Sequence, residues 1–157
     1  MLSQIYTYFT LETIYVWLNY TVIPLWIVLI FFPNSKINQL LISSIFIPLI
    51  FSIIYIYIIY QIFYLGENFL DLFKLYISLD EIKDLFKNDN FLIIFWVHFL
   101  AINLFLGSWV SRDAYKYSVP KFLSAITLIF IYFTGPLGIV LYWFIRIFYA
   151  KKVSLHD

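Results

Sequence analysis

The chain has no cysteine and only two histidines, and few of its residues carry charge. Without cysteine there are no disulfides, thiolate catalysis, zinc fingers or Cys-ligated iron–sulfur clusters. His98 and His156 cannot form the multi-histidine di-iron site of membrane desaturases and hydroxylases. We therefore predict no metal site and no cofactor. The net charge of +1, without a long basic run, gives no reason to expect a nucleic-acid partner.

Apolar residues make up most of what remains. The 157 residues are 64% hydrophobic and 12% charged, and the apolar residues form long uncharged blocks without amphipathic periods. Such blocks are typical of helices whose solvent is lipid. The sequence therefore predicts an all-α polytopic membrane protein, a four-transmembrane-helix bundle with one domain over residues 1–157. The first ten residues lack Lys and Arg, so a secretory signal is not expected there.

Four segments are long enough to cross a bilayer as helices. They cover residues 13–32, 37–65, 91–111 and 122–145. The four-residue turn 33–36 predicts that the first two form an antiparallel hairpin. Gly135-Pro136 in the last segment is expected to break or bend its helix.

The polar segment 67–90 separates the second and third blocks. Ser78 and Glu81 match a capping box, and Leu85 and Phe86 lie on the apolar face of the helix that would follow. We predict a short helix over about 79–87, either lying at the membrane interface or simply connecting two crossings.

The distribution of Lys and Arg predicts the orientation. With four crossings, six of these residues lie on the side of both termini and four on the other. The positive-inside rule then places both termini in the cytoplasm, and we expect the membrane to be the bacterial cytoplasmic (inner) membrane.

The block 91–111 carries polar groups that need partners in lipid. His98 is either a general acid or base in a lipid-substrate pocket, a role for which imidazole is a common side chain, or an interhelical hydrogen-bonding group. Asn103 is favoured as an interhelical bond former, and Gly107 with Ser111 allows a second helix to come close. At the end of the block, Asp113 either serves the chemistry or forms a solvated ion pair with the neighbouring Arg112.

The third and fourth blocks resemble the abscisic-acid-deficient-four-like family, whose plant members are associated with neoxanthin synthesis. The pieces that carry this resemblance are Trp96-Val-His98-Phe-Leu100, Asn103-Leu-Phe105, Gly107, Asp113 and Pro136-Leu-Gly138-Ile-Val140. Pro24, Pro33 and the Leu85-Phe86 helix fit as well, so the resemblance covers nearly the whole chain. One position departs from the family pattern, because the family has Asp where this chain has Asn103, and an amide cannot transfer a proton as a carboxylate does.

The resemblance implies cofactor-free isomerisation of a carotenoid or another isoprenoid, with an acid on an epoxide oxygen and a base for a carbon-bound proton. His98 and Asp113 are the catalytic candidates, but they are about 22 Å apart along one helix, so one of them needs a partner such as Glu12 or a tyrosine. The substrate-binding candidates are Trp96, Asn103, Gly107, Trp109 and Pro136. Expected partners are a membrane lipid or carotenoid-like ligand and another membrane protein or a second copy. The alternative is a non-enzymatic carotenoid-binding protein or an accessory subunit.

Overall fold

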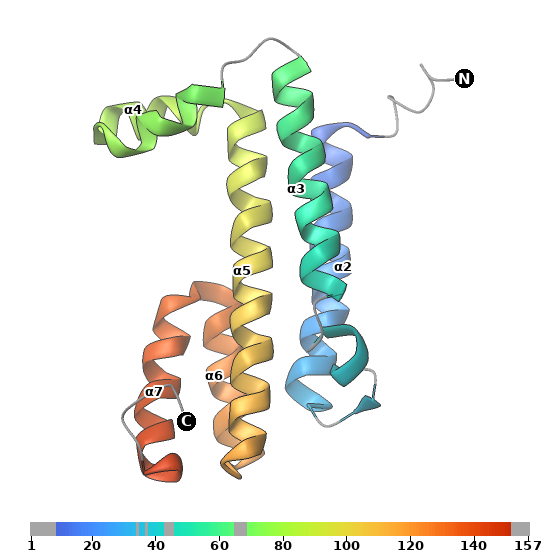
Figure 1. The fold of residues 1–157 in the computed structure, drawn as a ribbon, viewed down its shortest axis with the longest axis vertical. Coiled ribbons are helices and arrows are strands. Elements are labelled where there is room, and N and C mark those ends of the chain that lie inside the picture. Colours follow the sequence, from blue (N-terminus) through green and yellow to red (C-terminus); the bar gives the residue numbers. More distant parts are fainter. Residues whose placement is uncertain (1–8, 34, 37, 43–45, 65–68, 152–157) are drawn as a thin grey trace. The chain divides into compact units, whose positions relative to one another are not determined.

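The structure, a computed structural model, describes residues 9–33, 35–36, 38–42, 46–64 and 69–151. Throughout these ranges the regular structure is helical, as Figure 1 shows, so the all-α prediction is confirmed. The elements are α2 (Leu11–Phe31), the π-helix η1 (Asn38–Ile42), α3 (Phe46–Tyr64), the 3-10 helix η2 (Phe69–Tyr76), α4 (Leu79–Leu85), α5 (Asp89–Lys116), α6 (Lys121–Thr134) and α7 (Pro136–Ala150).

The chain divides into two compact units. Unit 1 contains the chain up to Thr21 together with Ile50–Leu100, and unit 2 contains Val22–Leu49 together with the chain from Ala101 onward. The helices α2, α3 and α5 each contribute residues to both units. The expectation of a single domain stays a prediction, and each unit is described below with its own contacts.

Two of the described helices, α2 and α5, are long and apolar enough to cross a membrane. They have 21 and 28 residues and coincide with the predicted blocks 13–32 and 91–111. The other apolar helical stretches within the described residues, Leu49–Ile62, α6 and α7, are shorter. Helices therefore form where the sequence predicts them, but a bundle of four crossings is not confirmed.

The helix α5 extends beyond residue 111, where the third predicted crossing ends. The helix continues to Lys116, and Ala114 in this last turn is buried. The turn stays helical because its residues pack within unit 2, where the side chain of Asp113 also finds its partners.

The predicted break at Gly135-Pro136 is confirmed, because residues 122–145 belong to two helices, α6 and α7. Gly135 has φ of 62°, a left-handed conformation that favours glycine, and Pro136 occupies the first turn of α7. The chain therefore reverses after α6, and α7 packs against α6 as a helical hairpin (Figure 1). At position 138 an added Cβ would overlap the backbone of Ile131, so glycine is needed for this close packing.

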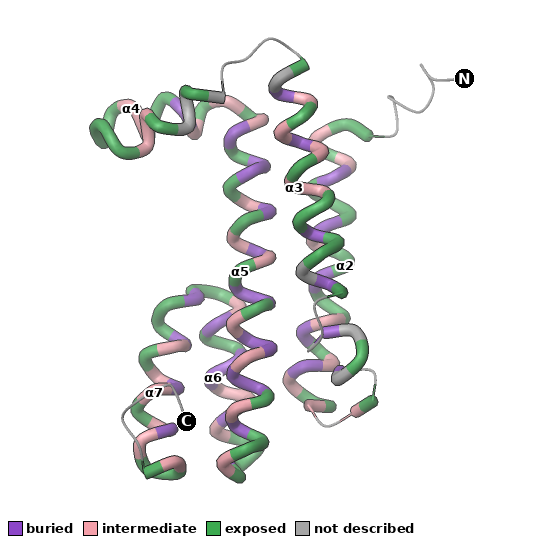
Figure 2. The backbone as a smooth tube through the Cα atoms, in the orientation of Figure 1, coloured by how far each residue is buried: buried purple, intermediate pink, exposed green. Residues whose placement is uncertain are grey.

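The predicted helix over about 79–87 is present as α4. Ser78 has the extended backbone of an N-cap, and its hydroxyl accepts a hydrogen bond from the Glu81 N–H at 3.3 Å. Only part of its apolar face is covered, because Leu85 is buried whereas Leu79 is 66% exposed, and Figure 2 shows this mixture along α4. The preceding helix η2 packs against α4 and was not predicted from the sequence.

Candidate functional site

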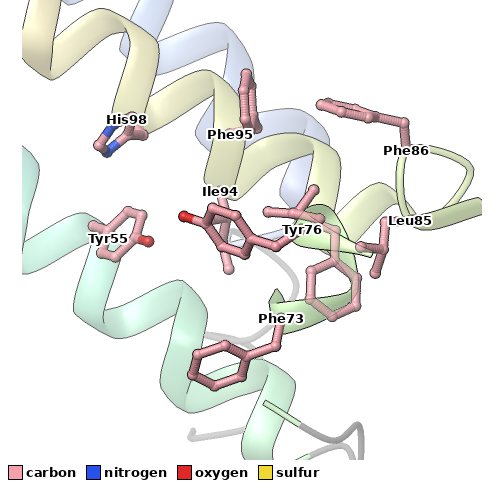
Figure 3. Close-up of a pocket in the computed structure, with 10 residues that line it drawn as sticks. Tyr55, Phe73, Tyr76, Leu85, Phe86, Ile94, Phe95 and His98 are labelled. Atoms are coloured by element: carbon pink, nitrogen blue, oxygen red, sulfur yellow. The ribbon is translucent and has the colours of Figure 1, made fainter. Parts of the chain in front are cut away.

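His98 is an exposed residue that lines a pocket formed within unit 1. The cavity is about 280 Å³, and side chains from α3, η2, α4 and α5 surround it, as Figure 3 shows. Its lining consists of Tyr55 from α3, Phe73, Leu75 and Tyr76 from η2, Leu85 and Phe86 from α4 and its C-cap, and Phe91, Ile94, Phe95 and His98 from α5. The walls are mainly aromatic and aliphatic, which is typical of a site for an apolar ligand.

The polar groups of this pocket are His98 and two tyrosines. The rings of His98 and Tyr55 lie 6.4 Å apart between centroids. In Figure 3 the hydroxyl-bearing ends of Tyr55 and Tyr76 point toward each other, and His98 lies on the same side of the pocket as Tyr55. An imidazole and two phenols therefore share one pocket, and each can donate or accept a proton.

The opposite wall of the pocket is apolar and held by ring packing. Phe86, just after α4, packs edge-on against Phe95 of α5, with ring centroids 4.9 Å apart and an angle of 72°. The buried Leu85 and Ile94 complete this wall. The short helix α4 thus has a structural consequence that its sequence alone does not reveal, because it closes one side of the His98 pocket.

Trp96 belongs to a second, neighbouring group of aromatic residues in unit 1. Its ring stacks on Phe99 at 5.5 Å and lies 6.0 Å from the ring of Tyr15. Its buried indole Nε1 has no hydrogen-bond partner within the described part of the chain. Trp96 is absent from the lining of the His98 pocket and instead borders a separate groove with Glu12 and Asp89.

The second catalytic candidate, Asp113, lies in unit 2 and is already engaged. Its Oδ2 accepts hydrogen bonds from the Tyr142 hydroxyl and from Arg146 Nε, both at 2.7 Å. The side chain of Arg146 is 1% exposed and that of Asp113 is 11% exposed. The interpretation of Asp113 as the solvated partner of Arg112 is wrong, because its ion pair is formed with Arg146 and is buried.

Aromatic residues extend this ion pair into a ladder between α5 and α7. Trp109 meets Tyr142 edge-on with ring centroids 5.7 Å apart, and the Arg146 guanidinium lies 4.9 Å from the ring centroid of Tyr117. The α5 side uses Trp109, Asp113 and, just after the helix, Tyr117, and the α7 side uses Tyr142 and Arg146. Residues four apart share one helix face, so each helix presents its members to the other.

Sequence reasoning missed Tyr142 and Arg146 as partners. From the sequence alone, Arg146 counts only as one of the positive charges used to predict the orientation. The signal available was the spacing of Gly138, Tyr142 and Arg146, which places a small residue, a phenol and a cation on one stripe of an otherwise apolar helix. All three are buried.

Residues 13–142 match the ABA DEFICIENT 4-like family. The chain belongs to this family. No curated protein and no solved structure matches it. The matched range of this ABA DEFICIENT 4-like protein includes α2 from Thr13 onward, all of α3, α4, α5 and α6, and the start of α7 up to Tyr142.

The remaining predicted binding residues of the ABA DEFICIENT 4-like chain lie in unit 2. Asn103 is 4% exposed and lies beside the α6–α7 turn, where a Cβ added at Gly135 would come within 2.5 Å of its Oδ1. Its Nδ2 has no hydrogen-bond partner within the described part of the chain. Gly107 faces the Trp26 ring edge, and Pro136 begins α7 with an exposed side chain.

The two ends of the family signature therefore have different surroundings. His98 faces the pocket of unit 1, whereas Asn103 and Asp113 contact the hairpin of α6 and α7 in unit 2. Packing accounts for Gly107 and Trp109 without a ligand, whereas the buried Nδ2 of Asn103 has no hydrogen-bond partner within the described part of the chain. The pocket with His98 brings an imidazole and two phenols together beside apolar walls.

Proposed function

We propose that this protein is an integral membrane protein that isomerises a carotenoid or another isoprenoid at the His98 pocket without a cofactor. The observation that carries the proposal is the meeting of His98, Tyr55 and Tyr76 at one apolar cavity. The family supports the substrate class, because its plant members are associated with neoxanthin synthesis.

The membrane location is supported by the surface of the protein. Large apolar side chains remain exposed along several helices, including Trp17 at 68%, Phe31 at 67% and Phe148 at 78%. Such surfaces are unfavourable in water and typical of contact with lipid. We place the protein in the bacterial cytoplasmic membrane, where apolar substrates dissolve.

In the proposed reaction the substrate gains one proton on its epoxide oxygen and loses one proton from the adjacent carbon. A phenol of Tyr55 or Tyr76 donates a proton to the epoxide oxygen as its carbon–oxygen bond breaks. The imidazole of His98 takes the proton from the adjacent carbon, and the electrons of that C–H bond form the new double bond. The product has the atoms of the substrate, with an added carbon–carbon double bond and a hydroxyl in place of the epoxide.

The cavity size indicates which part of the substrate enters. A volume of about 280 Å³ is at the lower limit for a ligand pocket and suits a cyclic end group better than a whole polyene. The remaining chain of the substrate would lie along exposed apolar helix surfaces in the lipid. This arrangement places only the reacting ring between His98 and the tyrosines.

A second candidate function is non-enzymatic binding of the carotenoid, or service as an accessory subunit. The amide of Asn103 replaces the carboxylate of the family pattern, and the carboxylate of Asp113 is held by Arg146. Neither position supplies a carboxylic acid to an isomerisation in this arrangement. The partner in that case would be another membrane protein or a second copy of this chain.

Pigment analysis in a host that makes epoxy-carotenoids tests the proposal. The protein should produce a new isomeric pigment, and His98→Gln should lower its formation about 10²–10⁴-fold, the usual contribution of a general acid or base. Tyr55→Phe or Tyr76→Phe should lower it too. Tyr60→Phe removes a hydroxyl from an exposed position of α3 outside this pocket and should leave it unchanged.

Unchanged pigments with the protein present in the membrane would contradict the enzymatic proposal. Co-purification of an unaltered carotenoid, lost in the His98→Gln variant, would then favour the binding function.

A further inference from the structure

The helix η2 carries a row of exposed apolar side chains. Leu70, Phe73 and Tyr76 are 63%, 61% and 87% exposed. Residues three apart eclipse one another in a 3-10 helix, so these three side chains form one line along η2. Ile77, directly after η2, is exposed as well, and we call these four residues the η2 stripe. Such a continuous apolar row is unfavourable in water and typical of a contact surface.

The neighbouring helix α4 presents the opposite chemistry to its surroundings. Two exposed ion pairs, Lys83 with Asp80 at 2.8 Å and Lys87 with Asp84 at 2.6 Å, lie on α4 and just after it. The apolar Leu85 of α4 is buried, and η2 packs against this helix. The pair of η2 and α4 therefore has an apolar edge and a charged edge, as elements that lie at a membrane surface do.

The start of α5 fixes the level at which this pair lies. The helix α4 ends at Leu85, and α5, which is long enough to cross a membrane, begins at Asp89. The ring contact between Phe86 and Phe95 holds the end of α4 against the beginning of α5. Figure 1 shows α4 running crosswise to α5 at this end. A segment that runs crosswise to a membrane-crossing helix at its end lies in the plane of the membrane surface.

The η2 stripe also forms the open side of the His98 pocket. Phe73 and Tyr76 line the cavity although both are largely exposed, and His98 is exposed too. Phe91 and Ile94, which line the same cavity from α5, are buried. The cavity therefore opens past the η2 stripe, so the medium around the stripe is also the medium at the mouth of the pocket.

We infer that the η2 stripe lies among the acyl chains at the bilayer surface, and that the His98 pocket opens sideways into lipid and receives its apolar ligand from there. The inference rests on the membrane location in the proposed function but not on the reaction at His98. Along α5, His98 follows Asp89 by nine residues, about 14 Å at the helical rise. The pocket thus extends from the membrane surface to the level of the acyl chains, where an apolar ligand dissolves.

Spin labels on single cysteines in liposomes of phosphatidylglycerol and phosphatidylcholine test this placement. The chain has no cysteine of its own, so each variant carries one label. Leu70→Cys and Ile77→Cys report on the η2 stripe, and Asp80→Cys and Lys83→Cys are the matched exposed positions on the charged edge. Molecular oxygen concentrates among acyl chains, whereas a polar nickel chelate stays in water. We expect oxygen to relax the labels at 70 and 77 more than the nickel chelate does, and the reverse at 80 and 83.

A label at Ile102→Cys separates this inference from the membrane location on which it rests. Ile102 is an exposed residue of α5 outside the His98 pocket, and its label should be oxygen-accessible wherever η2 lies. Nickel-accessible labels at 70 and 77 beside an oxygen-accessible label at 102 would overturn the inference alone. Nickel access at 102 as well would overturn the membrane location together with it.

Protection of positions 70 and 77 from both reagents would also overturn the inference, because it would mean that protein, such as a second copy of the chain, covers the stripe. His98→Gln should leave all label accessibilities unchanged while it abolishes pigment formation. Failure of the isomerisation proposal and failure of this inference therefore give different results.

Discussion

Asp113 shows how one residue can satisfy a family motif and still have a structural task. Its carboxylate is bound to Arg146 and Tyr142 in a nearly dry setting. Replacing it with Asn would leave the Arg146 guanidinium buried without its counter-charge. We expect Asp113→Asn to destabilise the protein by about 3–5 kcal/mol, measured as a lower thermal unfolding midpoint in detergent.

Removing both charges separates this structural role from a chemical one. A double replacement, Asp113→Leu with Arg146→Leu, should recover most of the stability lost in either single variant, because apolar pairs of similar volume often replace buried ion pairs without loss. If pigment formation returns together with stability, Asp113 is not a catalytic residue. A stable double variant without activity would instead require Asp113 in the chemistry.

At the scale of helices, the glycines of unit 2 differ in what surrounds them. A Cβ at Gly138 would meet backbone atoms of Ile131, with its Cα at 2.8 Å, whereas a Cβ at Gly107 would meet the ring edge of Trp26 at 2.6 Å. A side chain can rotate away and a backbone cannot. We expect Gly138→Ala to cost about 1–3 kcal/mol by overpacking and Gly107→Ala to cost less.

Thermal unfolding of the two alanine variants in the same detergent shows which substitution lowers the stability more. The comparison is matched, since both substitutions add one methyl group to a buried helical glycine of unit 2. A larger loss at Gly107 would mean that α2 and α5 tolerate less adjustment than the α6–α7 hairpin.

Local patterns predicted the helices well but not their partners. Uncharged length located α2 and α5, and the Ser78–Glu81 pair located the start of α4, because these signals depend on neighbouring residues alone. Gly135-Pro136 signalled a break, but composition could not show that the chain reverses there. The link between Asp113 and Arg146 depends on that reversal, so the sequence offered the nearer Arg112 instead.

At the scale of the whole molecule, the sequence predicts only part of the candidate site. His98 was found because an ionisable group in a long apolar block needs a reason to be there. Tyr55 and Tyr76 could not be singled out among 14 tyrosines, since their role depends on α3 and η2 meeting α5 around one cavity. Tertiary packing, rather than residue type, distinguishes them.

The α6–α7 hairpin also changes the expected orientation of the chain in the membrane. These helices are about 21 and 22 Å long at the α-helical rise, shorter than the roughly 30 Å of a hydrocarbon core. If α2, α3 and α5 cross and the hairpin does not, Lys116 and Lys151 share one side, and the N-terminus lies on the other. Of ten Lys and Arg residues, only Lys74, Lys83 and Lys87 then lie outside. The positive-inside rule favours this arrangement more strongly than the one with four crossings.

The absence of cysteine makes this topology directly measurable. Single variants Lys116→Cys, Lys151→Cys and Asp80→Cys place one thiol at an exposed position each. With a membrane-impermeant maleimide on intact cells, positions 116 and 151 should both stay unlabelled and position 80 should react; after permeabilisation all three should react. Labelling of position 116 but not 151, or the reverse, would mean that residues 122–145 cross the membrane after all. Positions 116 and 151 lie at opposite ends of the α6–α7 segment. Equal labelling of the two therefore places both ends of the segment on the same side of the membrane, whichever way the protein is inserted.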